Sequence, residues 1–292
     1  MPIPLLALMA AGFSSNVSRG SVEPVNLRKN IYGFTGTMAN SVIIEGRDGV
    51  LLVDSGESAS MGAQLKTAIS TVSGKPVEYL VNTHWHFDHV EGNVAFSNGD
   101  TTIIGHENMR RSAATEPLMA GEGLLPAAAL PHISFSDNLT LFINDEVLWL
   151  YHPDTGPAHT DGDVIVLFRN ANVLHMGDIF FNGMFPYIDV THGGRLAGIV
   201  AACRQALMFI DDDTIVVPGH GEIADKRTLA AYADELEKIN ESIERMVRKG
   251  MTLEEIQKAK PAAEMDALWG QGFMKTDYFV ELAYMGIKKY AR

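Results

Sequence analysis

The chain has 292 residues, of which 46% are hydrophobic and 20% charged, a composition typical of a folded domain with a sizeable core and unlike disordered or fibrous proteins. Its formal net charge of −13 argues against nucleic acid as a partner, because binding a phosphate backbone requires clustered Lys and Arg. The single cysteine, Cys203, excludes internal disulfides and thiolate clusters, so any metal ion must be held by histidines and carboxylates.

The first 21 residues allow two interpretations. Residues 1–13 are an apolar stretch that ends in small residues, and polar residues follow up to 21, which resembles a secretory signal without its basic leading segment. The alternative is an N-terminal arm that packs on the domain. We expect export to the periplasm or secretion, with the cytoplasm as the alternative. No other apolar run is long enough to cross a bilayer, so we expect no membrane insertion.

Strands and helices alternate in two halves of similar layout. In the first half the expected strands are residues 41–45, 50–54, 77–81 and 101–104, and the expected helices are 62–72 and 107–114. A long loop rich in Gly, Pro and Ala follows at 116–131. In the second half the expected strands are 139–143, 146–151, 164–168, 172–175 and 214–217, with a helix at 196–209. This order predicts two packed sheets with helices outside.

The C-terminal part is expected to be helical. Apolar residues recur at intervals of three and four from Leu229 to Met246, which predicts a long amphipathic helix that ends at Gly250. Residues 252–255 resemble a capping box. We therefore expect one domain over residues 22–250 and a helical extension over 251–292. The extension is expected to pack on the body or on a second copy of the chain, as a homodimer.

Four residues able to bind metal lie within six positions, directly after the strand expected at 77–81. They are His84, His86, Asp88 and His89. A loop after a buried strand can bend such side chains toward one point. Imidazoles and a carboxylate without thiolates suit Zn²⁺, with Mn²⁺ or Fe²⁺ as the next choices.

Three further candidates each follow an expected strand. They are His159, Asp178 and His220. Each alone could be an ordinary loop residue, but strand ends that deliver histidine or aspartate to one sheet edge would make a seven-ligand site. Seven ligands are enough for two ions, with room left for water.

The motifs His84-x-His-x-Asp-His89, Gly156-x-x-His-Thr160, Gly177-Asp178 and Pro218-Gly-His-Gly221 occur in this order. Together they resemble the metallo-β-lactamase superfamily, over about residues 30–222. The resemblance implies a four-layer αββα sandwich with its site along one sheet edge. It implies a first metal on His84, His86 and His159, a second on Asp88, His89 and His220, Asp178 as a bridge, and Asp54 supporting a ligand from behind.

The resemblance also implies a metal-dependent hydrolase. Two cations a few ångströms apart lower the pKa of a bridging water from about 16 toward 7, which provides hydroxide at neutral pH. Asp88 is expected to hold and pass on the proton. The expected substrate is a small, fairly apolar molecule with a carbonyl centre, and weak β-lactam hydrolysis is included in this expectation.

Two positions depart from one β-lactamase subclass. Asp178 stands where that subclass has a zinc-binding cysteine, and Phe181 stands where it has a lysine that binds the drug's carboxylate. Arg195 or Lys226 would have to replace that lysine. An aspartate bridge is more similar to the thioesterase and lactonase branches, although the basic glutathione-binding pattern of the thioesterases is not visible. The inserted second domain of the nuclease branches is absent.

The expected substrate wall is the apolar stretch at residues 180–187, with Phe181, Phe185 and Tyr187 facing the substrate and His192 lining the same pocket. The alternative for the stretch is ordinary packing under the helix at 196–209. His152 is a weaker pocket candidate. Of the other histidines, we expect His106 and His132 on the surface and His175 in the core.

Three alternative functions stay open. The first is hydrolysis of a lactone, thioester or phosphate ester with the same ions and a different pocket. The second is a mononuclear-iron dioxygenase that uses only His84, His86 and His159. The third is a non-catalytic metal-binding partner of another exported enzyme.

Overall fold

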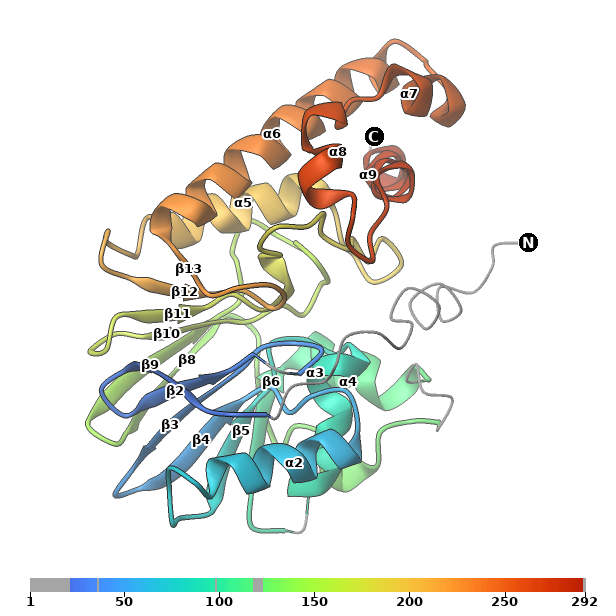
Figure 1. Ribbon diagram of the computed structural model, residues 1–292. Coiled ribbons are helices and arrows are strands. Elements are labelled where there is room, and N and C mark those ends of the chain that lie inside the picture. Colours follow the sequence, from blue (N-terminus) through green and yellow to red (C-terminus); the bar gives the residue numbers. More distant parts are fainter. Residues whose placement is uncertain (1–21, 36, 98, 118–122, 291–292) are drawn as a thin grey trace.

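The computed structural model describes residues 22–35, 37–97, 99–117 and 123–290. The segment 1–21, expected to be a signal or an arm, lies outside the described residues, as do residues 118–122 of the long loop. The described part forms two β-sheets and their covering helices (Figure 1).

Sheet A takes its seven strands in chain order. They are β1 (Val25–Arg28), β2 (Ile31–Phe34), β3 (Ser41–Gly46), β4 (Gly49–Val53), β5 (Val77–Val81), β6 (Thr102–His106) and β7 (Ile133–Phe135). Sheet B has the order β13-β12-β11-β10-β9-β8. Its strands are β8 (Asn138–Ile143), β9 (Glu146–Tyr151), β10 (Ile165–Phe168), β11 (Val173–His175), β12 (Ile215–Val217) and β13 (Ala224–Asp225).

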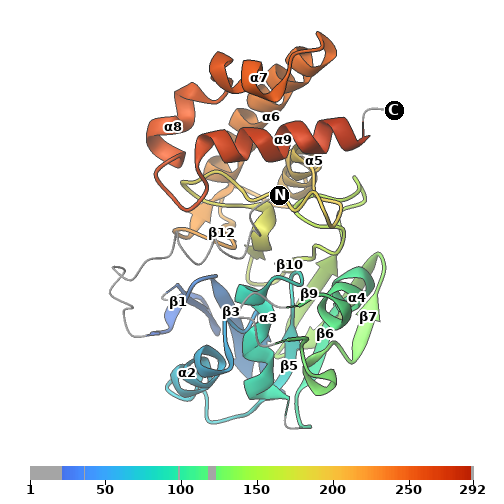
Figure 2. The ribbon, with the colours of Figure 1, turned by 90° about the vertical axis from the view of Figure 1, so that its right-hand side faces the viewer.

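Helices cover the outer face of each sheet. On the side of sheet A lie α2 (Ala59–Ile69), α3 (Phe87–Val90) and α4 (Glu107–Thr115). On the side of sheet B lie α5 (Leu196–Leu207) and α6 (Lys226–Arg248), followed by α7 (Leu253–Ala259), α8 (Ala263–Trp269) and α9 (Thr276–Tyr290). Figure 2 shows α6 to α9 gathered above sheet B. The expected αββα sandwich with a helical C-terminal extension is confirmed.

Strand β4 and the first four residues of β3 in sheet A are buried on both faces, and successive side chains point to opposite layers. Val42 and Ile44 of β3 join the core between the two sheets, whereas Ile43 joins the core under α2 with Leu65. Side chains alternate across a strand, so a sheet covered on both faces needs apolar residues at every position. This explains the continuous apolar run at residues 42–44.

Most expected elements are present, with boundaries that match or are shifted by no more than three residues. Three short elements near the site were not expected: α3, the 3₁₀ turn η1 (Glu91–Phe96) and the 3₁₀ turn η3 (Gly177–Ile179). The capping box is confirmed, because Thr252 accepts from the Glu255 N–H and Glu255 accepts from the Thr252 N–H.

Parallel strand pairing places the ligand-bearing loops at one edge. β4, β5 and β6 run parallel in sheet A, and β11 and β12 run parallel in sheet B. The carboxyl ends of parallel strands meet at one edge, so the residues after β4 and β5 lie together, and so do those after β11 and β12. The two edges face each other across the sandwich.

The C-terminal helices complete the core of the second half. Leu236 and Ile239 of α6 and Phe279 of α9 are buried in the same apolar cluster as Leu174 of sheet B. The domain boundary at residue 250 and the homodimer stay predictions. Among the described residues, no helix combines the length and apolar character that a bilayer span requires.

Candidate metal centre

The first position is formed by His84, His86 and His159. His84 and His86 lie in the loop between β5 and α3, and His159 lies in the loop before β10. Nδ1 of His86 lies 3.1 Å from Nε2 of His84 and 2.9 Å from Nε2 of His159. Three ring nitrogens therefore converge on one point.

The second position is formed by Asp88, His89 and His220. Asp88 and His89 lie on α3, and His220 follows β12. Oδ2 of Asp88 lies 3.3 Å from Nε2 of His220 and 3.9 Å from Nε2 of His89. The short helix α3 matters because it turns two consecutive residues toward the same point as the His220 loop.

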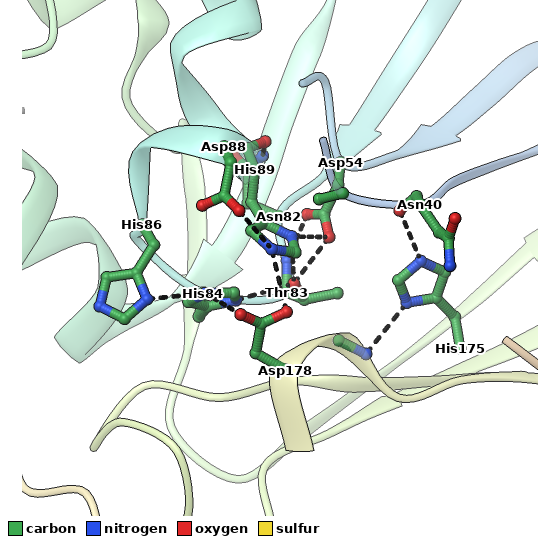
Figure 3. A network of polar contacts seen from close by, with 12 residues as sticks. Asn40, Asp54, Asn82, Thr83, His84, His86, Asp88, His89, His175 and Asp178 are labelled. Atoms are coloured by element: carbon green, nitrogen blue, oxygen red, sulfur yellow. Dashed lines mark hydrogen bonds and ion pairs between the residues drawn. The ribbon is translucent and has the colours of Figure 1, made fainter. Parts of the chain in front are cut away.

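Asp178, in η3, lies between the two positions (Figure 3). Its Oδ1 is 3.0 Å from Nε2 of His89, and its Oδ2 is 3.6 Å from Nε2 of His159. The seven residues expected from the sequence are thus brought together, as two groups whose ligand atoms lie within 4.8 Å of one another.

The donor set fits metal ions. His89 Nε2 and Asp178 Oδ1 are buried and neither makes a hydrogen bond, although they lie 3.0 Å apart. Buried polar groups without partners are rare, and a cation accepted by both would satisfy them. Imidazole and carboxylate ligands without thiolate suit zinc and other borderline divalent ions.

The ring nitrogens that face away from the two positions all have partners. Histidines that bind metal usually engage their second nitrogen in this way, which fixes the ring orientation. The partners are Thr83 Oγ1 for His84, Asp189 for His86, Asp54 for His89, the Tyr187 carbonyl for His159 and the Met38 carbonyl for His220.

Asp54 supports the loop after β5. It is fully buried at the end of β4 with a φ of 60°, a left-handed conformation that aspartate tolerates better than most residues. Its Oδ1 accepts from the Thr83 N–H at 2.8 Å, and its Oδ2 lies 2.7 Å from His89 Nδ1. Asp54 therefore stands behind His89, where the sequence resemblance had placed a supporting residue.

Asp189 was missed by the sequence analysis. Its Oδ2 accepts from His86 Nε2 at 3.0 Å and from His192 Nδ1 at 2.7 Å. The residue is buried. The available signal was an aspartate two residues after the apolar stretch at 180–187 and three residues before a histidine.

The charges of the centre balance one another. Burial lowers the pKa of His159 to about 4 and that of His84 well below its usual value. Burial has the same tendency at His220, but Asp178 and Asp88 outweigh it and raise the pKa of His220 to about 10. Burial would raise the pKa of Asp178, but His220 and His89 hold it well below its usual range. Divalent cations would take the place of the protons on His89 and His220.

Aromatic side chains frame the centre. Tyr187 lies 5.7 Å from the His86 ring, and Trp85 lies 4.6 Å from the His192 ring, measured between centroids. Phe181 is fully buried and stacks on the ring of the ligand candidate His220 at 4.9 Å. Phe273 of the extension lies 6.1 Å from His220, a contact that the sequence did not indicate.

Phe185 lies apart from the centre. It is fully buried and stacks on Phe279 at 4.5 Å, with Trp269 at 5.6 Å. The structure therefore places this residue between the site loop and the C-terminal helices. Its part in substrate binding stays a prediction.

The remaining histidines have structural partners. His106, expected on the surface, is only 3% exposed; its Nδ1 accepts from the Asn108 N–H at the start of α4, and its ring stacks on His152. His132 is exposed and His175 is buried, both as expected.

The two cations considered for carboxylate binding are engaged elsewhere. Arg195 donates to the carbonyls of Pro157 and Thr155, and Lys226 donates to the carbonyl of Ile210. Within the described ranges, the charged contacts of the seven ligand candidates involve only histidine and aspartate.

A family model described as the metallo-beta-lactamase superfamily matches residues 34–220. The chain belongs to this superfamily. The matched range begins at the end of β2 and ends at His220, so it contains all seven ligand candidates. Its relatives include a protein named a probable metallo-hydrolase from Bacillus subtilis, 26% identical over 65% of this chain and 88% of the relative. A hydroxyacylglutathione hydrolase from Polaromonas sp. is 25% identical over 57% of this chain and 58% of the relative.

Two curated relatives are longer than this chain. The alpha subunit of 2,4-dinitroanisole O-demethylase from Nocardioides sp. is 28% identical over 201 residues, which cover 68% of this chain and 57% of the relative. A linear primary-alkylsulfatase from Pseudomonas sp. is 25% identical over 260 residues, which cover 73% of this chain and 48% of the relative. The chain thus spans about half the length of these two proteins.

Solved structures show the same fold. A metallo-beta-lactamase from Pontibacter korlensis has a TM-score of 0.62 at 23% identity, over 74% of this chain and 98% of that one. A stereoselective inverting sec-alkylsulfatase from Pseudomonas sp. has a TM-score of 0.72 at 17% identity, over 92% of this chain and 50% of that one. The second likeness covers most of the described chain, so it takes in part of the helical extension.

Replacing Asp189 with asparagine is expected to weaken metal binding at the first position about 10- to 100-fold, because His86 loses the carboxylate that orients its ring. Competition with a chromophoric chelator measures this dissociation constant. Asp211→Asn, which changes an exposed carboxylate outside the centre, is the matched control. Equal affinities in the wild type and Asp189→Asn would show that the contact has no role in holding the metal.

Proposed function

We propose that this protein is a hydrolase that holds two divalent cations, zinc in the first instance, and acts on a small, fairly apolar substrate with a carbonyl centre. The observation that carries the proposal is the presence of two adjacent ligand groups with the carboxylate of Asp178 between them. A mononuclear-iron dioxygenase would need only the first position. Five buried or half-buried histidines with oriented rings support two ions.

When bound, two such cations supply Lewis acidity and a water molecule that is deprotonated near neutral pH. The chain's own residues set the conditions for this chemistry. Asp88 is buried on α3, and its Oδ2 faces His220. Burial would raise the pKa of Asp88, but His89 and His220 lower it, so this carboxylate is placed to accept a proton beside the second position and to pass it on. Asp178 keeps a negative charge between the two positions, since nearby histidines hold its pKa low.

His192 offers a hydrogen-bond donor at the rim. Its Nδ1 donates to Asp189, and its Nε2 lies 3.9 Å from Glu116. The hydrogen bond to Asp189 raises the pKa of His192, which favours the form that can donate from Nε2. We propose that His192 orients an oxygen atom of the substrate by donating a hydrogen bond to it from Nε2.

The frame of the centre supports a small apolar substrate. Trp85 and Tyr187 flank His86. Arg195 and Lys226 are engaged by backbone carbonyls, those of Pro157 and Thr155 for Arg195 and that of Ile210 for Lys226. A substrate that depends on a cation for binding, such as a glutathione thioester, is therefore disfavoured. Lactones, simple esters and β-lactams fit this frame better. We also propose that the protein acts in the periplasm as a homodimer.

A second candidate is hydrolysis of a sulfate ester of an apolar alcohol. The alignment with the linear primary-alkylsulfatase extends over 260 residues, beyond the 201 residues shared with the O-demethylase subunit. If the C–O bond of such an ester breaks, sulfate leaves as an anion, and divalent cations beside it would neutralise the charge that develops.

A substrate panel tests these proposals. Purified protein with measured metal content is assayed on a β-lactam, a lactone, an ester, a thioester, a phosphate ester and a medium-chain alkyl sulfate. We expect about two zinc ions per chain and metal-dependent turnover of an uncharged acyl substrate. Turnover confined to the alkyl sulfate would favour the second candidate. A single iron with oxygen uptake, or no metal-dependent turnover, would overturn the proposed function.

A further inference from the structure

Asn40 directly precedes β3 in sheet A, yet it holds the loop of sheet B that carries His220. Its N–H donates to the Gly219 carbonyl at 2.8 Å. Its Nδ2 donates to the carbonyls of Pro218 at 3.0 Å and Gly221 at 2.9 Å. Asn40 is 4% exposed, so water does not replace these contacts easily. One side chain and its backbone thus fix the residues on both sides of His220.

His175 connects Asn40 to the loop that carries Asp178 (Figure 3). Its Nε2 donates to the Asn40 carbonyl at 3.1 Å, and its Nδ1 accepts from the Gly177 N–H at 3.1 Å. A carbonyl only accepts and an amide N–H only donates, so both contacts require the neutral ring with its proton on Nε2. His175 is completely buried at the end of β11.

The two ligand loops also contact each other directly. The Gly219 N–H donates to the Gly177 carbonyl at 2.8 Å. A Cβ at Gly219 would lie 2.0 Å from Oδ1 of Asp178, so only glycine permits this approach. Small shifts of either loop would therefore change the separation of Asp178 and His220, whose ligand atoms lie 3.3 Å apart.

We propose that Asn40 and His175 are positioning residues that hold Asp178 and His220 at the separation required for the second metal position, and so set the metal affinity of that position. This inference rests on the proposed two-metal centre. The first position is oriented by other groups, namely Thr83, Asp189 and the Tyr187 carbonyl. The effect of Asn40, whose side chain holds only the His220 loop, is therefore selective for the second position, whereas His175 acts on Asp178, which both positions share.

The principal variant is Asn40→Ala, which removes both side-chain contacts to the His220 loop. His175→Asn is a milder second variant, because the asparagine oxygen can still accept from the Gly177 N–H while the contact to the Asn40 carbonyl is lost. The matched control is Asn144→Ala. Asn144 is also a buried asparagine, and it joins Gly49 and Asp48 in sheet A from the β8–β9 turn, away from the metal centre.

The experiment measures zinc dissociation constants by competition with a chromophoric chelator. The variants are compared in two backgrounds: His86→Ala, which weakens the first position, and His220→Ala, which weakens the second. In the His86→Ala background, Asn40→Ala is expected to raise the dissociation constant of the remaining position about 10- to 100-fold, with a smaller increase for His175→Asn. In the His220→Ala background Asn40→Ala should not change it, and Asn144→Ala should change it in neither background.

Equal weakening of both positions by Asn40→Ala would mean a general structural role and would overturn the inference. Unchanged affinity at the second position in both variants would overturn it as well. If either result is obtained and the wild-type protein binds two zinc ions, the inference fails and the proposed function still stands. A wild-type protein that binds fewer than two would overturn the proposed two-metal centre, and the inference with it.

Discussion

Replacing Asp178 with alanine is expected to lower kcat/KM by about 10³-fold or more and to reduce the bound metal below two ions per chain. The carboxylate lies 3.0 Å from His89 Nε2 and 3.3 Å from His220 Nε2, and it reaches His84 at 3.7 Å. It thus contacts histidines of both positions. Its loss removes a ligand from each and leaves the cationic charge without its central counterion.

Metal content after dialysis and turnover of the preferred substrate check this prediction. Asp161→Asn is the matched control, because Asp161 lies in the His159 loop, yet its carboxylate pairs with Arg111 at 3.4 Å. The control should keep both ions and full turnover. Asp178→Cys offers a thiolate in the same place, which should shift metal affinity and favour β-lactam turnover. If Asp178→Cys left both quantities untouched, Asp178 would not be a ligand.

Replacing Phe185 with alanine is expected to reduce the free energy of unfolding by about 3–5 kcal/mol, the usual loss for a buried phenylalanine that leaves a cavity. Phe185 is fully buried and its ring is nearly parallel to that of Phe279, at 16° and a centroid distance of 4.5 Å. The contact joins the loop after Asp178 to α9. Its loss should therefore loosen the C-terminal helices from the body.

Urea unfolding followed by circular dichroism measures the effect. Phe142→Ala, at a position that is 80% exposed on β8, is the control and should change the free energy of unfolding by no more than about 0.5 kcal/mol. The competing interpretation, in which Phe185 lines the substrate pocket, predicts a raised KM with an unchanged unfolding midpoint. That result would show that Phe185 contributes to substrate binding and little to stability.

Local sequence patterns predicted much of the fold. The continuous apolar run at residues 50–53 predicts a buried strand. The recurrence of apolar residues at intervals of three and four in α6 predicts a helix with one buried face. The density of ligands from His84 to His89 reports metal binding without any knowledge of the fold. Short elements such as α3 were not predictable, because four residues carry too little periodicity to distinguish a helix from a loop.

By itself, the sequence determined the residue types of the metal centre, their order and the alternation of elements that brings them to one sheet edge. Apart from Asp54, which the resemblance had indicated, only the tertiary structure decided which groups hold these residues in place. Asp189 lies 103 positions from His86, and Asn40 lies 135 positions from His175. No local pattern records such pairs, because they meet only when the two sheets pack. The cluster at residues 84–89 thus indicates bound metal, whereas the packed sandwich sets the geometry in which that metal is held.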